Sequence, residues 1–143
     1  FPRKLRPSTV NPDALEASDK ATLIYEVWDK TSRKMRITVN NVIPLKQWTH
    51  ITITAGSTDA FRPALNVYIN GTLLYTKVDG CLPSTGLMTN CYLGKSNWRR
   101  VSQYSNKDEL FKGSMFDFRT YSVPVTEEFV EQSFAWGKSK LRA

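Results

Sequence analysis

The dipeptide Asn70-Gly71 lies between two runs of β-forming residues and constrains the fold more than any other local feature. Residues 65–69 (Leu-Asn-Val-Tyr-Ile) precede it, and residues 72–76 (Thr-Leu-Leu-Tyr-Thr) follow it. Asn-Gly favours a two-residue hairpin turn because both central residues must adopt positive φ. The sequence therefore predicts a tight antiparallel hairpin. A turn of this length predicts the cross-strand pairs Ile69 with Thr72, Tyr68 with Leu73 and Val67 with Leu74.

Further β-strands are indicated by alternation of apolar and polar residues. In residues 34–40, Met35, Ile37 and Val39 fall on one face, which is the pattern of a half-buried strand. Residues 22–28 are rich in β-branched and aromatic side chains and should form a hairpin with this strand across the polar turn 29–33. In the alternating strand 48–54, we expect Ile51 and Ile53 to face one way, and Trp48, His50 and Thr52 to face the other.

The C-terminal third has a different pattern. We expect short strands at residues 92–94 and 111–121, separated by a long polar loop at 95–110. Residues 126–136 form the one convincing helix, with Thr126 as its N-cap and Gly137 as its end. Many short strands with one terminal helix predict an all-β fold: an antiparallel β-sandwich, or jelly roll, with one short C-terminal helix.

The length of 143 residues suggests one domain. We divide the chain into an extended, basic, proline-rich arm at residues 1–20 and a sandwich domain at 21–143. No run of 18 apolar residues occurs, so we expect no membrane span. The net charge of +7 favours acidic partners such as sulfated glycans or acidic protein surfaces, or else a surface that is basic without a ligand. Because the basic residues are scattered and not striped, nucleic acid ranks last.

The two cysteines, Cys81 and Cys91, are too far apart for a CxxC site. A disulfide between them would close the loop that they bracket and would contribute roughly 2–3 kcal/mol. Two separate buried thiols are the alternative. Asn70-Gly71-Thr72 is an acceptor sequence for N-glycosylation, and we expect Asn70 to be exposed in its hairpin turn.

Five motifs, in order, resemble the laminin G-like and pentraxin-like jelly rolls of the concanavalin A-like lectin-glucanase superfamily. The resemblance as a whole covers about residues 22–137. The resemblance lies in W-T-H-I-T-I-T at 48–54, V-Y-I-N-G at 67–71, Y-L-G-K-S at 92–96, F-K-G-S-M-F-D-F-R-T-Y at 111–121 and V-T-E-E-F at 125–129.

The resemblance implies a sandwich fold, but the strands that usually open such a domain are absent before Thr22. Without these strands the sheets would have exposed edges, which natural proteins avoid. We therefore expect one of three things: residues 1–20 cover the edge, the chain is a fragment, or another polypeptide supplies the missing strands.

Catalysis is not expected. Glycoside hydrolysis needs two carboxylates at a defined separation, and the E-x-D-x-x-E strand of the superfamily's glucanases does not occur here. We interpret His50 as a strand histidine with a satisfied hydrogen bond. Asp117 and Arg119 lie two apart on one predicted strand and should form a structural cross-strand ion pair.

The resemblance makes calcium the cofactor to consider, although the sequence predicts none. Asp79, Asn90 and Asp108 are candidate oxygen ligands. The candidate ligand-binding residues lie in the long polar loop, where an aromatic ring could stack on a sugar and cations could hold sulfate or carboxylate. They are Lys95, Asn97, Trp98, Arg99, Arg100 and Tyr104. The alternative is that Trp98 packs into the core.

Two functions remain open. The first is a non-catalytic binding or adhesion module of the laminin G-like type, outside the cell or on its surface, which recognises an acidic glycan or protein. The second is a docking subunit or fragment of a larger assembly, including an intracellular one, that uses a lectin-like fold without sugar binding. The motifs and the acceptor triplet favour the first function; the missing strands and the basic arm favour the second.

Overall fold

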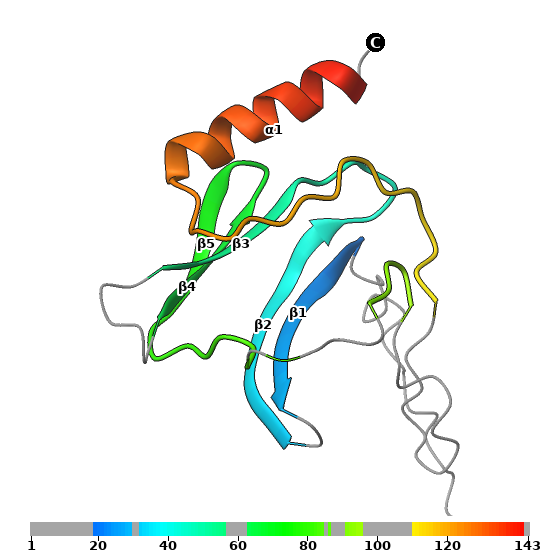
Figure 1. Ribbon diagram of the computed structural model, residues 1–143. Helices are drawn as coiled ribbons and strands as arrows, with labels where there is room; N and C mark the ends of the chain where they lie inside the picture. The colour runs from blue at the N-terminus through cyan, green and yellow to red at the C-terminus, as the bar shows by residue number, and fades with distance from the viewer. Residues whose placement is uncertain are drawn as a thin grey trace, which may run out of the picture.

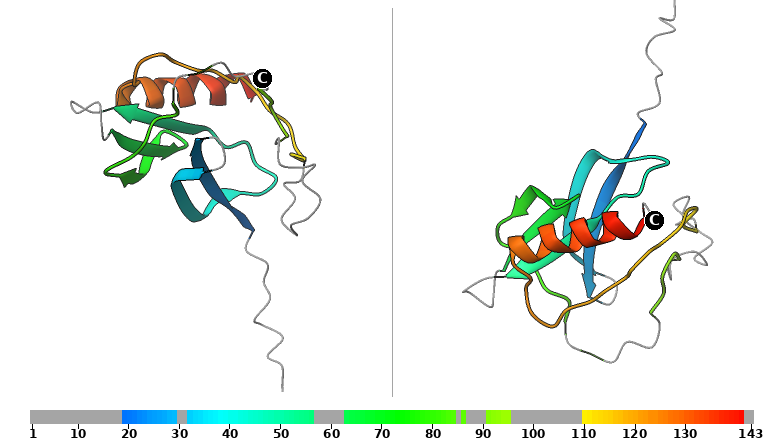
Figure 2. Two further views of the ribbon diagram at one scale, coloured as in Figure 1. Left: turned by 60° about the horizontal axis from the view of Figure 1, so that its bottom comes forward. Right: turned by 90° about the horizontal axis from the view of Figure 1, so that it is seen from above.

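The computed structural model describes residues 19–29, 32–56, 63–84, 86, 91–95 and 110–141. Within them the chain forms two antiparallel sheets and one C-terminal helix (Figure 1). Seen from the side, the two-stranded sheet, the three-stranded sheet and the helix lie in that order (Figure 2). The arrangement confirms the predicted antiparallel sandwich with one helix at the end.

The first sheet is a hairpin of β1 (Lys20–Asp29) and β2 (Ser32–Pro44). Its alternation follows the prediction, because Met35 and Ile37 are buried while the intervening residues are exposed. Two register shifts interrupt the pairing, one of them between Val27 and Trp28. Such irregularities increase the local twist of a hairpin.

The second sheet contains β3 (Ile51–Gly56), β4 (Ala64–Ile69) and β5 (Thr72–Lys77), with β4 in the centre. The Asn-Gly turn forms as predicted, with positive φ at both residues. The pairs Ile69–Thr72 and Tyr68–Leu73 are confirmed, but Val67 pairs with Tyr75 and not with Leu74. A bulge at this point adds a residue to β5, which the turn chemistry alone does not specify.

The hydrophobic core lies between the two sheets. Five buried residues form one cluster: Val27, Met35, Ile37, Leu65 and Val67. Side chains from β3, including Ile53 and Ala55, pack against the cluster. The core thus joins the β1–β2 hairpin to one face of the three-stranded sheet, as sandwich packing requires.

Helix α1 (Glu127–Leu141) covers the opposite face of the three-stranded sheet (Figure 2). The backbone N–H of Phe129 donates to Thr126 Oγ1 at 3.2 Å, so Thr126 caps the helix as predicted. The predicted end at Gly137 is wrong, since the helix continues to Leu141. A glycine inside a helix costs only about 1 kcal/mol, and Lys138 and Lys140 favour the negative end of the helix dipole.

The strands predicted at 92–94 and 111–121 are not present as strands. Gly94 has positive φ, and its carbonyl accepts from the N–H of Phe111 at 2.8 Å. Residues 113–125 make no backbone hydrogen bond to another segment of the described chain. A β-forming sequence becomes a strand only when a neighbour supplies ladder hydrogen bonds, and these residues lack that neighbour within the described part.

Candidate functional site

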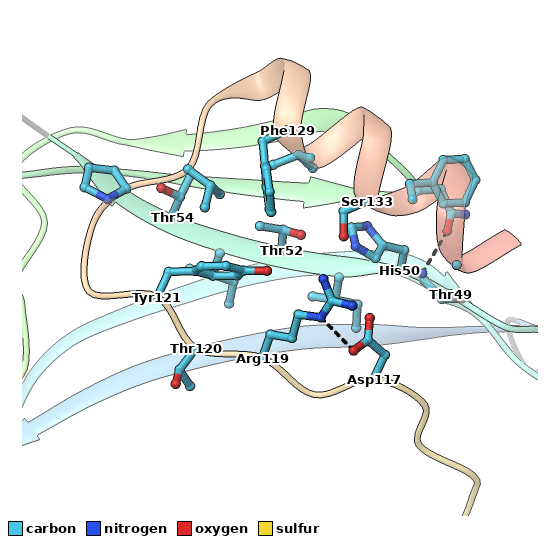
Figure 3. A pocket seen from close by; sticks show the side chains of 18 of the residues that line it. Thr49, His50, Thr52, Thr54, Asp117, Arg119, Thr120, Tyr121, Phe129 and Ser133 are labelled. Carbon is cyan, nitrogen blue, oxygen red and sulfur yellow. Dashed lines mark hydrogen bonds and ion pairs between the residues drawn. The ribbon is translucent and has the colours of Figure 1, made fainter. Parts of the chain in front are cut away.

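The described residues form a cleft of about 810 Å³. It lies between β3, helix α1 and residues 116–125, which we call the wall segment (Figure 3). The side chains of Thr52 and Thr54 on β3, and of His50 just before it, project toward the helix. Strand alternation explains this arrangement, because the neighbouring Ile53 and Ala55 face the core. The strand predicted at 48–54 begins later than expected, at Ile51.

Aromatic contacts hold the wall segment against α1. The Tyr121 ring meets the Phe129 ring edge-on at 5.4 Å between centroids, and Phe116 stacks on Trp136 at 6.0 Å. The Arg119 guanidinium lies 4.9 Å from the centre of the Trp136 ring. Contacts of these kinds are each worth about 1 kcal/mol. At the far end of β3, a Cβ on Gly56 would lie 3.0 Å from Pro124, so the cleft closes there.

The charged pair of the cleft is Asp117 and Arg119. Arg119 Nε donates to Asp117 Oδ1 at 2.7 Å. Hydrogen bonds to Asp117 and to Tyr121 raise the pKa of Arg119. The predicted ion pair is therefore present, but it joins two residues of one segment and does not cross between strands. Asp117 has φ of 58°, which breaks the regular alternation on which the cross-strand prediction rested.

Three buried polar atoms of the cleft lining have no hydrogen-bond partner within the described residues. They are Thr49 Oγ1, His50 Nδ1 and Thr54 Oγ1. The predicted satisfied hydrogen bond of the His50 side chain is thus wrong for Nδ1, although the backbone N–H of His50 donates to Asn70 Oδ1 at 3.0 Å. Buried polar groups normally have partners. Their concentration here marks the cleft as a place for a ligand that supplies hydrogen bonds.

Burial lowers the pKa of His50 below its ordinary value of 6.5, and Asp117 opposes this shift. The Phe134 ring lies 6.0 Å from the imidazole and contributes to its burial. An imidazole in such surroundings is neutral at physiological pH, so it offers one donor and one acceptor to a ligand.

We expect the stability of the protein to fall as the pH is lowered below about 6.5. The unfolded chain binds a proton at His50 near that pH, while the folded chain, with its lower pKa, binds it only in more acidic solution. The stability contributed by neutral His50 is therefore complete above pH 6.5 and is lost through the folded pKa. Urea denaturation between pH 7.5 and 5 should show a shallower pH dependence in His50→Gln. An unchanged slope in this variant would contradict the assignment.

Of the sequence-predicted binding residues, the structure describes only Lys95. Its Nζ lies 3.9 Å from the centre of the Tyr92 ring, and the residue is exposed. Lys95 is not part of the cleft lining. Asn97, Trp98, Arg99, Arg100 and Tyr104 lie outside the described residues.

The calcium candidates are described only in part. Asp79 is exposed, with φ of 56°, whereas Asn90 and Asp108 lie outside the described residues. No group of three or more His, Cys, Asp or Glu side chains that could hold a metal occurs in the part of the chain that the structure describes. The prediction of no cofactor, with calcium as the one to consider, stays a prediction.

Two further predictions concern the disulfide between Cys81 and Cys91 and the exposure of Asn70. Cys81 and Cys91 are free thiols in the structure, which matches the alternative of two separate thiols, although Cys81 is only half-buried and Cys91 is exposed. The expected exposure of the Asn70 turn is wrong. Asn70 is half-buried, and Gly71 is buried against Phe134 and Glu131 of α1. The helix covers this turn, which the local sequence does not indicate.

Sequence reasoning treated His50 and the Asp117–Arg119 pair as structural, and it assigned no role to Thr54. A signal was nevertheless present. His50, Thr52 and Thr54 form a polar stripe on one face of an otherwise β-branched strand. When a helix covers such a stripe, its buried polar groups need hydrogen-bond partners. The position of the stripe therefore indicates where the cleft lies.

The sandwich and the cleft together define a lectin-like β-sandwich module. Residues 10–131 match a family model of the laminin G group, described as the concanavalin A-like lectin/glucanases superfamily. The chain therefore belongs to this superfamily, as its motifs predicted. No curated protein matched the chain.

A solved structure supports the fold independently. The chain resembles the crystal structure of residues 221–444 of an S-layer domain-containing protein from Clostridium thermocellum, with a TM-score of 0.54 and 22% identity. The match covers 71% of this chain and 45% of the other, so this chain spans less than half the length of that structure. At this identity the likeness concerns the fold alone.

Proposed function

We propose that this chain is a non-catalytic module that binds another protein outside the cell or on its surface. The observation that carries the proposal is a row of exposed apolar side chains along residues 110–123, next to the cleft. Phe118 and Val123 have 65% and 67% of their surface exposed, and Phe111 has 54%. Exposed apolar side chains that gather on one segment mark a protein–protein contact more often than a sugar site, whose ligand needs many polar partners.

The cleft adds specificity to this surface. Its polar atoms, on β3 and just before that strand, and the Arg119–Asp117 pair offer fixed hydrogen-bonding groups beside apolar side chains. A few placed polar groups in a mainly apolar site fix the orientation of a bound partner. We therefore favour a protein over an acidic glycan as the ligand, both of which the sequence left open.

The proposed location, outside the cell or on its surface, is based on similarity to other proteins. Laminin G-like domains act widely in binding, and the solved neighbour is described as an S-layer domain-containing protein. Both favour a place at the cell surface. Within the described residues no helix is long and apolar enough to cross a membrane.

An acidic glycan is the second candidate, and the outer face of the β1–β2 hairpin favours it. Arg33 and Arg36 both contact one carboxylate, Glu26, at 3.1 and 3.4 Å. Trp28 donates from Nε1 to the same carboxylate at 3.0 Å, and its side chain is 38% exposed. Two guanidinium groups on one carboxylate leave a net positive charge beside an exposed indole, which suits sulfate or carboxylate on a sugar.

Photo-crosslinking separates the two candidates. A benzoylphenylalanine at position 118 should form an adduct with a surface protein of the producing cells, and the adduct should disappear after protease treatment. The same group at position 34, on the outer face of the hairpin, is the matched control and should not form it.

Adducts that resist protease but disappear with glycosidase, or adducts at position 34 alone, would overturn the proposal. Retention on heparin that Arg33→Ala/Arg36→Ala abolishes would support the glycan instead.

A further inference from the structure

One edge of β3 is open within the described residues. The sheet order places β3 at the margin, paired only with β4. Asn70 N–H donates to the His50 carbonyl at 2.9 Å, which makes 50 and 70 a hydrogen-bonded pair. In an antiparallel ladder such pairs alternate. The N–H and C=O groups of Ile51, Ile53 and Ala55 therefore point away from β4, toward the open edge.

The wall segment faces this edge across the cleft (Figure 3). Its residues make no backbone hydrogen bond to another segment of the described chain, and they run past β3 without pairing with it. Two stretches of main chain whose groups lack partners among the described residues thus lie on either side of one hollow. A sheet edge of this kind is a template for another strand.

The cleft has room for a short extended segment. Its volume of about 810 Å³ is of the order that five residues of extended chain fill at the usual rise, strand spacing and sheet spacing. The contact between Gly56 and Pro124 closes one end, so an added strand would lie beside Ile51–Ala55. Thr54 is only 7% exposed, and its Oγ1 lacks a partner there. A polar side chain or main-chain group of the added strand would satisfy it.

We propose that the cleft receives an extended strand of the partner protein, inserted between β3 and the wall segment. This inference rests on the proposed function and names how the partner is held. The strand's main chain bonds to Ile51, Ile53 and Ala55. Its side chains alternate between the apolar side that faces the core and the polar side beneath α1. On the polar side they can form hydrogen bonds with the side chains of His50 and Thr54. Main-chain bonding supplies affinity, and the alternating pockets supply sequence preference.

The test uses peptides selected from a displayed library of random 12-residue peptides against the whole chain. We expect the selected peptides to alternate apolar and polar residues. On binding, they should slow amide hydrogen exchange at Ile51, Ile53 and Ala55 at least tenfold. Methylation of alternate peptide nitrogens should weaken binding at least tenfold in one register and leave it nearly unchanged in the other, because only one edge of the peptide faces β3. The exposed turn residue Asp79, far along the chain from β3, is the internal control and should show unchanged exchange.

Three outcomes would overturn the inference: failure to select any peptide, selected peptides that leave the β3 amides unprotected, or equal effects of methylation in both registers. The proposed function fails separately. If crosslinking at position 118 still captures a protein in any of these cases, protein binding stands and only strand insertion is lost. If crosslinking fails while peptides protect β3, the cleft is a strand receptor but the apolar row is not the partner surface.

Discussion

Replacement of Ile37 by alanine is expected to lower the free energy of unfolding by about 3 kcal/mol. Ile37 has 1% of its surface exposed and belongs to the cluster that joins the two sheets. The shortened side chain loses its transfer free energy and leaves a cavity in this cluster of five buried residues. Urea denaturation, followed by tryptophan fluorescence and by circular dichroism, measures the change.

The neighbouring residue provides the control for this prediction. Thr38 is exposed on the opposite face of β2, so Thr38→Ala should change the stability by less than about 0.5 kcal/mol. Equal losses in Ile37→Ala and Thr38→Ala would mean that the hairpin does not pack against the second sheet. Because the hairpin and the second sheet meet mainly through this cluster, that result would also remove the basis for calling the fold a sandwich.

Local patterns predicted the parts of the fold that local forces decide. The Asn-Gly turn, the alternation around Ile37 and the Thr126 cap all act within a few residues, and all are present. The errors concern interactions between distant segments. The bulge opposite Val67 and the unpaired state of residues 111–121 depend on which neighbour a strand finds. A single sequence contains no local signal for that choice.

The site was harder to predict than the fold for a related reason. The sequence placed the binding residues in the polar loop after Lys95, because exposed loops commonly carry function. The cleft instead combines β3, the wall segment and α1, three elements separated by up to some ninety positions in the chain. His50 and Thr54 became candidates only when the structure showed that a helix covers them and that His50 Nδ1 and Thr54 Oγ1 have no hydrogen-bond partner among the described residues.

Substitution of Val130 by aspartate should detach helix α1 from the sheet. Val130 is 1% exposed and is the one buried residue of the helix. An unpaired carboxylate at this position costs about 3 kcal/mol or more, either as a buried charge or through protonation and displacement of the helix. Amide exchange in Glu127–Leu141 should accelerate strongly, while the Ile37 cluster on the other face of the sheet stays protected.

The same substitution should also remove the cleft, because α1 is one of its walls and holds the wall segment through Phe129 and Trp136. Adducts at position 118 and protection of β3 by peptides should therefore both be lost in Val130→Asp. Ala135→Asp introduces the same charge at an exposed position of the helix and should preserve both. If Val130→Asp loses the helix but still binds peptides along β3, then the open edge alone suffices for recognition. The helix would then serve only to cover the sheet, and the polar stripe beneath it would have no part in selecting the strand.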